Sequence, residues 1–97
     1  MKFNISESRI SDICKENNII YLGLFGSQSR GEARKDSDLD LLIDFDQTKS
    51  LFELSRLKSV FEKLFQKEID ITLRKNIKDT VKPFIIKDLN TLYGKRD

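Results

Sequence analysis

The sequence predicts an α/β or α+β domain in which a small mixed sheet of about three to four strands is flanked by helices. Two observations predict this class. Three short runs rich in apolar and β-branched residues, 19–25, 39–45 and 68–73, have the length and composition of strands. Longer segments before, between and after them carry apolar residues at helical spacing. Because the two kinds of segment alternate along the chain, the helices are expected to cover the sheet.

Composition narrows the chemistry that the chain can perform. Its 97 residues are expected to form one domain, 1–97, and a net charge of +2 does not favour a nucleic-acid partner. One cysteine and no histidine exclude an internal disulfide, histidine-based acid–base catalysis and Cys/His zinc sites. The N-terminus lacks the apolar run of a signal peptide, and no apolar run approaches the ~20 residues that cross a bilayer. We therefore expect a cytoplasmic protein without a membrane segment.

The N-terminal segment predicts a helix over residues 5–16. Asn4 and Glu7 have the spacing of a capping box, in which each side chain bonds the other residue's backbone N–H. The apolar residues recur at helical spacing, and Cys14 falls on the apolar face. We expect Cys14 to be a buried core residue rather than a reactive thiol.

The run 19–25 predicts a central strand, because it is apolar without polar alternation and would be covered on both faces. Gly23 in its middle indicates a close approach by another part of the chain. A short helix is expected over 27–33. Its first-turn N–H groups would point back toward the strand end, which is a natural site for a phosphate.

The run 39–45 predicts a second strand with one acidic and one apolar face. Alternation places the two sets of side chains on opposite faces. The acidic face carries Asp38, Asp40, Leu42 and Asp44, and the apolar face carries Leu39, Leu41, Ile43 and Phe45.

The second half of the chain predicts a helix, a strand and a final helix. Ser50 and Glu53 form a capping box before a helix over 51–65, whose apolar stripe is expected in the core. The third strand, 68–73, would point Asp70 away from its apolar neighbours. A last amphipathic helix is expected over 81–93, with Pro83 in its first turn and Gly94 at its end.

Carboxylates gather where the second strand begins. Residues 36–46 contain five aspartates and no basic residue, a cluster that would repel itself without a cation. Asp38 and Asp40 start ~6–7 Å apart on one strand face, so both can reach one divalent ion. If the third strand is a neighbour, Asp70 joins them, and three carboxylates suit two ions that clamp a phosphoryl displacement. Alternatively, Asp70 is an edge residue or a partner of Arg74.

The order of these residues resembles a known signature. Gly26-Ser27, ten further residues and Asp38-Leu39-Asp40 resemble the Gly-Ser-x10-Asp-x-Asp pattern of the DNA polymerase β-like nucleotidyltransferase superfamily. The fuller string 25–43 resembles its minimal nucleotidyltransferases, which are the antitoxin partners of HEPN-domain toxins. The resemblance extends over nearly the whole chain and implies the nucleotidyltransferase fold.

The resemblance also implies roles for individual residues. Gly26 would let the triphosphate of ATP approach the backbone, Ser27 would bond a phosphate oxygen, and Arg30 would be a phosphate or internal charge partner. The catalytic ligands of two Mg²⁺ ions would be Asp38, Asp40 and Asp70.

The implied activity is transfer of AMP from ATP to a tyrosine of a cognate HEPN toxin, which silences the toxin's RNase activity. Because only residues 94–97 follow the last expected helix, we expect a partner protein to supply the acceptor, in a hetero-oligomer with the toxin. Two alternatives stay open: an antitoxin that masks the toxin without catalysis, and a small-molecule nucleotidyltransferase.

Overall fold

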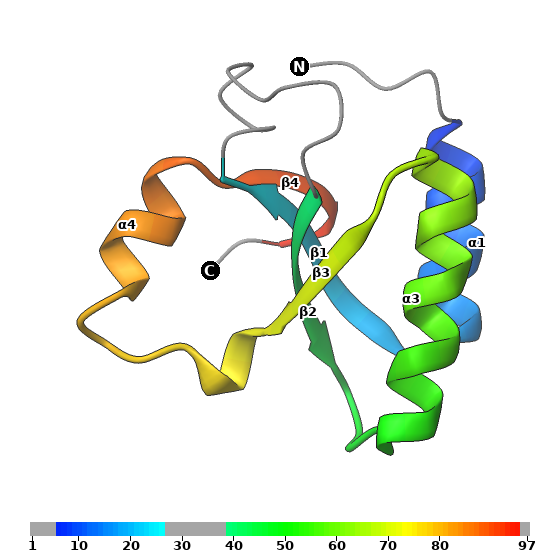
Figure 1. The fold of residues 1–97 in the computed structure, drawn as a ribbon, viewed down its shortest axis with the longest axis horizontal. Helices are drawn as coiled ribbons and strands as arrows, with labels where there is room; N and C mark the ends of the chain where they lie inside the picture. The colour runs from blue at the N-terminus through cyan, green and yellow to red at the C-terminus, as the bar shows by residue number, and fades with distance from the viewer. Residues whose placement is uncertain (1–5, 27–38, 96–97) are drawn as a thin grey trace.

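A mixed four-stranded sheet forms the centre of the structure, a computed structural model that describes residues 6–26 and 39–95. The strands within these residues are β1 (Ile19–Phe25), β2 (Leu39–Phe45), β3 (Ile69–Leu73) and β4 (Asn90–Gly94), in the order β3-β2-β1-β4. Helices α1 and α3 lie on one side of the sheet and α4 on the other (Figure 1). The predicted fold class is confirmed.

The pairing of the strands explains why the sheet is mixed. β1 is antiparallel to both β2 and β4, whereas β2 and β3 are parallel. Helix α3 connects the parallel pair, as a crossover between parallel strands requires. β1 and β2 have the predicted bounds, and β1 is a central strand as expected.

Helix α1 (Glu7–Glu16) begins later than the sequence predicts. Its N-cap is Ser6 rather than Asn4, because Ser6 has an extended backbone and its carbonyl accepts the first helical hydrogen bond from Ile10, 3.2 Å away. The Ser6 side chain makes no capping bond. Asn4 itself lies outside the described residues.

Helix α3 (Leu51–Phe65) has the predicted bounds and the predicted cap. The Glu53 N–H donates to Ser50 Oγ at 3.1 Å, and the Ser50 N–H donates to Glu53 Oε1 at 3.3 Å. The bond from the Ser50 N–H and a further one from the Ser50 hydroxyl, 3.2 Å from Glu53 Oε1, favour the ionised carboxylate and lower the pKa of Glu53. The capping box thus satisfies N–H groups that the first turn would otherwise leave without partners.

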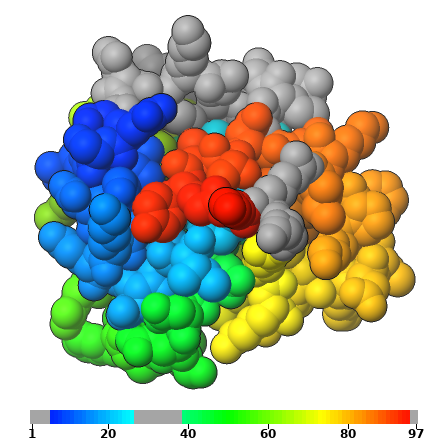
Figure 2. Space-filling view, turned by 180° about the vertical axis from the view of Figure 1, so that it is seen from behind, coloured from blue at the N-terminus to red at the C-terminus, as the bar shows by residue number. Residues whose placement is uncertain are grey.

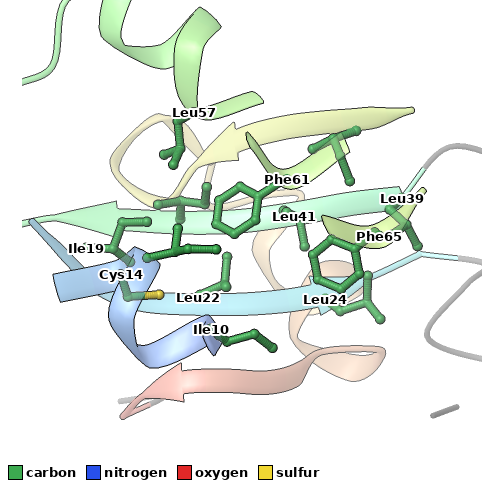
Figure 3. Close-up of a cluster of buried hydrophobic side chains, with 13 residues drawn as sticks. Ile10, Cys14, Ile19, Leu22, Leu24, Leu39, Leu41, Leu57, Phe61 and Phe65 are labelled. Atoms are coloured by element: carbon green, nitrogen blue, oxygen red, sulfur yellow. The ribbon is translucent and has the colours of Figure 1, made fainter. Parts of the chain in front are cut away.

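The main core lies between the sheet and the helices α1 and α3 (Figure 3). Cys14 is fully buried there, as expected, and burial raises the pKa of its thiol to about 12. The buried members of this core are Ile10, Ile13, Cys14, Ile19, Leu22, Leu24, Leu39, Leu41, Ile43, Leu57, Phe61, Phe65 and Ile69.

A smaller cluster covers part of the opposite sheet face. Tyr21, Leu42 and Leu89 are buried in it, and Ile85 of α4 packs against them. A Cβ at Gly23 would come within 2.7 Å of Leu89 Cδ1 and 2.8 Å of Tyr21 Oη. The close approach predicted at this glycine is therefore confirmed.

The predicted final helix over 81–93 is wrong in its second half. Helix α4 spans only Lys82–Lys87, and β4 follows it along the edge of β1. Tertiary pairing outweighs the helical spacing, because β4 gains a hydrogen-bonded ladder with β1 and Thr91 Oγ1 lies 2.9 Å from Tyr21 Oη. Figure 2 shows β4 at the surface between α1 and the segment that carries α4.

Two details of the C-terminal prediction have separate outcomes. Pro83 lies in the first turn of α4, as expected. Gly94 does not end a helix but closes β4 with φ of 84°, where a Cβ would overlap the carbonyl oxygen of Ile20. Of the helices in the described part of the chain, none is long and apolar enough to span a membrane.

Candidate active site

Asp40 and Asp70 lie side by side on neighbouring strands. In the parallel pairing of β2 and β3 the two residues are direct register partners, and such strands are about 4.8 Å apart. The residues that flank them, Leu39, Leu41, Ile69 and Ile71, face the main core. Both carboxylates therefore project from the opposite face of the sheet. The third strand is therefore a neighbour of the second, which is the condition under which Asp70 was expected to join Asp40.

Asp70 is exposed on the edge strand β3, and Asp40 is half-buried on β2. This difference follows from position, since β2 has a neighbour on either side and β3 is at the end of the strand order. A pair of carboxylates with one exposed member is open to a ligand that approaches from solvent.

Gly26 brings the end of β1 against the same carboxylate. The preceding residue, Phe25, is the register partner of Asp40, and Gly26 itself has φ of 85°. A Cβ at Gly26 would lie 2.5 Å from Asp40 Oδ2. The missing side chain therefore makes room for the carboxylate as well as relieving backbone strain. The sequence predicted that the turn after the first strand faces the carboxylates at the start of the second, and the contact joins residues 14 positions apart on antiparallel strands.

Three predicted site residues, Ser27, Arg30 and Asp38, lie outside the described residues, and their roles stay predictions. Within 6–26 and 39–95, no set of three or more His, Cys, Asp or Glu side chains is placed to hold a metal ion. Asp40 and Asp70 contribute two hard oxygen donors, the type that Mg²⁺ prefers. This donor set fits a divalent cation whose remaining ligands are phosphate or water oxygens.

Arg74, which the sequence left open as a partner of Asp70, brings its positive charge to Asp44 on the acidic face. Its Nη1 lies 3.9 Å from Asp44 Oδ2, and its guanidinium lies 5.3 Å from the centre of the Tyr21 ring. Asp44 is four residues beyond Asp40 on the same strand face. The acidic face of β2 thus has two ends: one beside Gly26 and Asp70, the other neutralised by Arg74.

A cavity of about 180 Å³ lies between α4 and this sheet face. Leu42 forms part of its wall. It is the next residue after Asp40 on the same face of β2, and consecutive residues on one strand face are about 6.6 Å apart. Its lining is mostly apolar: Tyr21, Leu42, Arg74, Ile77, Lys82, Ile85, Ile86 and Leu89. Helix α4 is therefore a neighbour of the carboxylate pair.

Comparison with known proteins identifies relatives along most of the chain. The family described as "Nucleotidyltransferase domain" matches residues 7–91. The protein adenylyltransferase MntA of Thermococcus cleftensis is 32% identical over 68 residues, which are 70% of this chain and 69% of the relative. A protein of Methanocaldococcus jannaschii, named provisionally as a protein adenylyltransferase, is 32% identical over 88 residues, or 91% and 95% of the two chains.

Solved structures share the fold. A crystal structure described as a toxin–antitoxin with AMP-PNP matches with a TM-score of 0.76 and 18% identity, over 95% of this chain and 76% of that one. A tri-AMPylated Shewanella oneidensis HEPN toxin in complex with MNT antitoxin gives a TM-score of 0.66 and 16% identity, over 92% and 70%. Because the family match extends over most of the sequence and the sheet brings Asp40, Asp70 and Gly26 together, the chain belongs to the nucleotidyltransferase domain family.

Proposed function

We propose that this chain is a Mg²⁺-dependent adenylyltransferase that transfers AMP from ATP to a tyrosine hydroxyl of a cognate HEPN-domain toxin. The modification silences the toxin's RNase activity, so the chain acts as an antitoxin in a cytoplasmic hetero-oligomer. The observation that carries the proposal is the carboxylate pair Asp40–Asp70 in direct register, with Gly26 against it. Relatives at 32% identity that are named as protein adenylyltransferases support the choice of a protein acceptor.

Each proposed binding residue has a physical task. The triphosphate approaches the chain at Gly26, where no side chain stands between ligand and backbone. Ser27 donates its hydroxyl to a phosphate oxygen, and Arg30 balances phosphate charge. The carboxylates of Asp38, Asp40 and Asp70 hold two Mg²⁺ ions, which supply charge neutralisation for the triphosphate and for the developing transition state.

The transfer itself is an in-line displacement. The tyrosine oxygen forms a bond to the α-phosphorus while the bond from that phosphorus to the oxygen bridging the α- and β-phosphates breaks. Pyrophosphate leaves with the electron pair, and the hydroxyl proton passes to the exposed carboxylate of Asp70, which acts as general base. The face that carries Asp70 is open to solvent at the edge of the sheet, so an acceptor side chain can reach it.

The direct test is the mass of the purified cognate HEPN-domain toxin after incubation with the chain and Mg-ATP. We expect a gain of one or more AMP units, confined to a tyrosine by peptide mapping, and no gain when EDTA removes the divalent ion. Full neutralisation of the toxin without any gain in mass would instead identify the chain as a masking antitoxin and overturn the catalytic proposal.

A further inference from the structure

Large apolar side chains are exposed at several places on the described surface, and two of these places carry a strongly exposed phenylalanine. One is the first turn of α3, with Leu51 and Phe52. The other is the N-terminal end of α4, with Val81 and Phe84; we call it the α4 patch. Phe52 and Phe84 are both 73% exposed, which is unusual for an aromatic side chain that serves only folding.

The two regions differ in their distance from the carboxylate pair. Helix α4 packs Ile85 onto the cluster that contains Leu42, the residue next to Asp40 on the same strand face. The chain leaves α4 and enters β4 at Asn90, which pairs with Leu24 two residues before Gly26. The start of α3, in contrast, follows the far end of β2 (Figure 1). Only the α4 patch adjoins the site.

The α4 patch is also strongly basic. Residues 74–87 contain five basic side chains and one acidic side chain, and four of the basic ones are exposed lysines. The lysines are Lys75, Lys78, Lys82 and Lys87, of which Lys82 and Lys87 belong to α4 itself. A surface with an aromatic anchor and neighbouring positive charge is complementary to a polypeptide segment with apolar side chains and carboxylates.

We propose that the α4 patch docks an acidic, apolar segment of the protein that carries the acceptor tyrosine, an inference that rests on the proposed function. The lysines attract acidic residues of the acceptor protein, whereas the carboxylates of Asp40 and Asp70 repel them. These two effects together orient the acceptor protein. The docked segment therefore lies over α4 and leaves the tyrosine to reach the neighbouring site. Phe84 supplies the central apolar contact.

Phe84→Ser and Phe52→Ser form a matched pair for the test, since both remove an aromatic side chain of equal exposure from the surface. The probe is the purified HEPN-domain toxin of the proposed function, titrated in a calorimeter. We expect Phe84→Ser to raise Kd about tenfold or more, the loss typical of an interface anchor, and Phe52→Ser to leave Kd within about twofold. Lys82→Glu should also raise Kd, and its effect should shrink at about 0.5 M salt because exposed charges are screened.

AMP transfer provides the second readout. Phe84→Ser should raise the KM for the acceptor protein and leave kcat at saturation and Mg-ATP affinity unchanged. Equal Kd values for Phe84→Ser and wild type, or an equal loss for Phe52→Ser, would overturn the docking surface. Binding that depends on Phe84 without any AMP transfer would keep the docking surface and refute the proposed activity. Loss of single-stranded RNA binding in both α4 variants, with acceptor binding intact, would reassign the patch to nucleic acid.

Discussion

The two faces of the sheet differ in role, although the same strands form both: one face builds the main core and the other carries the carboxylates. On β2 the residues Leu39, Leu41 and Ile43 enter the main core, which α1 and α3 cover. The alternate residues Asp40 and Asp44 face the other side, where three buried side chains and a short helix form a much smaller cluster. Burial of apolar area stabilises the fold on the first face, whereas the second face keeps half-buried charge next to solvent.

The contrast separates stability from chemistry along single strands. A side chain on the covered face has many apolar neighbours, so its loss should lower the free energy of unfolding. A carboxylate on the acidic face contributes little apolar burial, so its loss should affect ligand binding and transfer. Substitutions at alternate positions of one strand can therefore test whether stability depends on the covered face and activity on the acidic face.

The largest effect is expected for Phe61→Ala on the covered face. Phe61 is fully buried between α3 and the sheet, and its ring centre lies 6.1 Å from that of Phe65. Truncation removes apolar burial and leaves a cavity, so the free energy of unfolding should fall by about 3–5 kcal/mol. Urea denaturation measures the loss. The exposed Phe52→Ala on the same helix should change it by less than about 0.5 kcal/mol, and a comparable loss there would contradict the assignment of the core.

Gly26→Ala should damage the acidic face with a smaller cost in stability. Alanine at φ of 85° is strained by about 1–2 kcal/mol, and its Cβ would displace the carboxylate of Asp40. We expect Mg-ATP binding, followed by calorimetry, to weaken more than the strain alone explains. Gly94→Ala has a similar φ of 84° but also a Cβ that would overlap the carbonyl oxygen of Ile20, so its loss of stability gives an upper bound for the strain at Gly26. Equal nucleotide affinity for Gly26→Ala and wild type would show that nucleotide binding does not depend on the position of the Asp40 carboxylate.

Ser50→Ala tests the covered side at a residue far from the acidic face. The substitution removes the oxygen that accepts from the Glu53 N–H, so unfolding should become easier by about 1 kcal/mol. Mg-ATP affinity should not change, since the cap lies at the start of α3. Chemical denaturation measures the stability and calorimetry measures the Mg-ATP affinity of the same samples. A loss of nucleotide affinity would show that the helix cap and the acidic face are not independent.

The smallest effect is a pH dependence at the same cap. The Ser50 N–H and hydroxyl bond the Glu53 carboxylate and lower its pKa in the folded state. The contribution of the ionised carboxylate is present above the unfolded-state pKa, about 4.3 for Glu, and is lost as the pH falls through the lower folded-state pKa. The stability difference between wild type and Glu53→Gln should therefore shrink on acidification across this window. A difference that grows toward low pH would contradict the sign.

Local signals in the sequence were sufficient for much of the fold. β1, β2 and α3 have the predicted bounds because alternation, an unbroken apolar run and a capping box act over a few residues. β4 was missed because it depends on pairing with the free edge of β1, and its own residues fit a helical stripe equally well. The start of α1 was misplaced for a related reason, since two polar residues near it can act as the N-cap.

The candidate site was predicted only as far as spacing and strand phase allow. Alternation placed Asp40 and Asp70 on one face, and the sheet brings them into register. The pairing of Arg74 with Asp44 depends on how distant segments meet, so no local pattern could indicate it. Ser27, Arg30 and Asp38 keep their predicted roles as hypotheses.

Asp40→Asn and Asp44→Asn test most sharply whether the Asp40 end of the acidic face performs the AMP transfer. The two residues share a strand and a face but lie near opposite ends of the strand. The measurement is the mass of the HEPN-domain protein after incubation with each variant and Mg-ATP. We predict that Asp40→Asn transfers almost no AMP while still binding the HEPN-domain protein, and that Asp44→Asn transfers AMP at close to the wild-type rate. Unchanged transfer by Asp40→Asn would contradict the account, as would loss of transfer by Asp44→Asn alone.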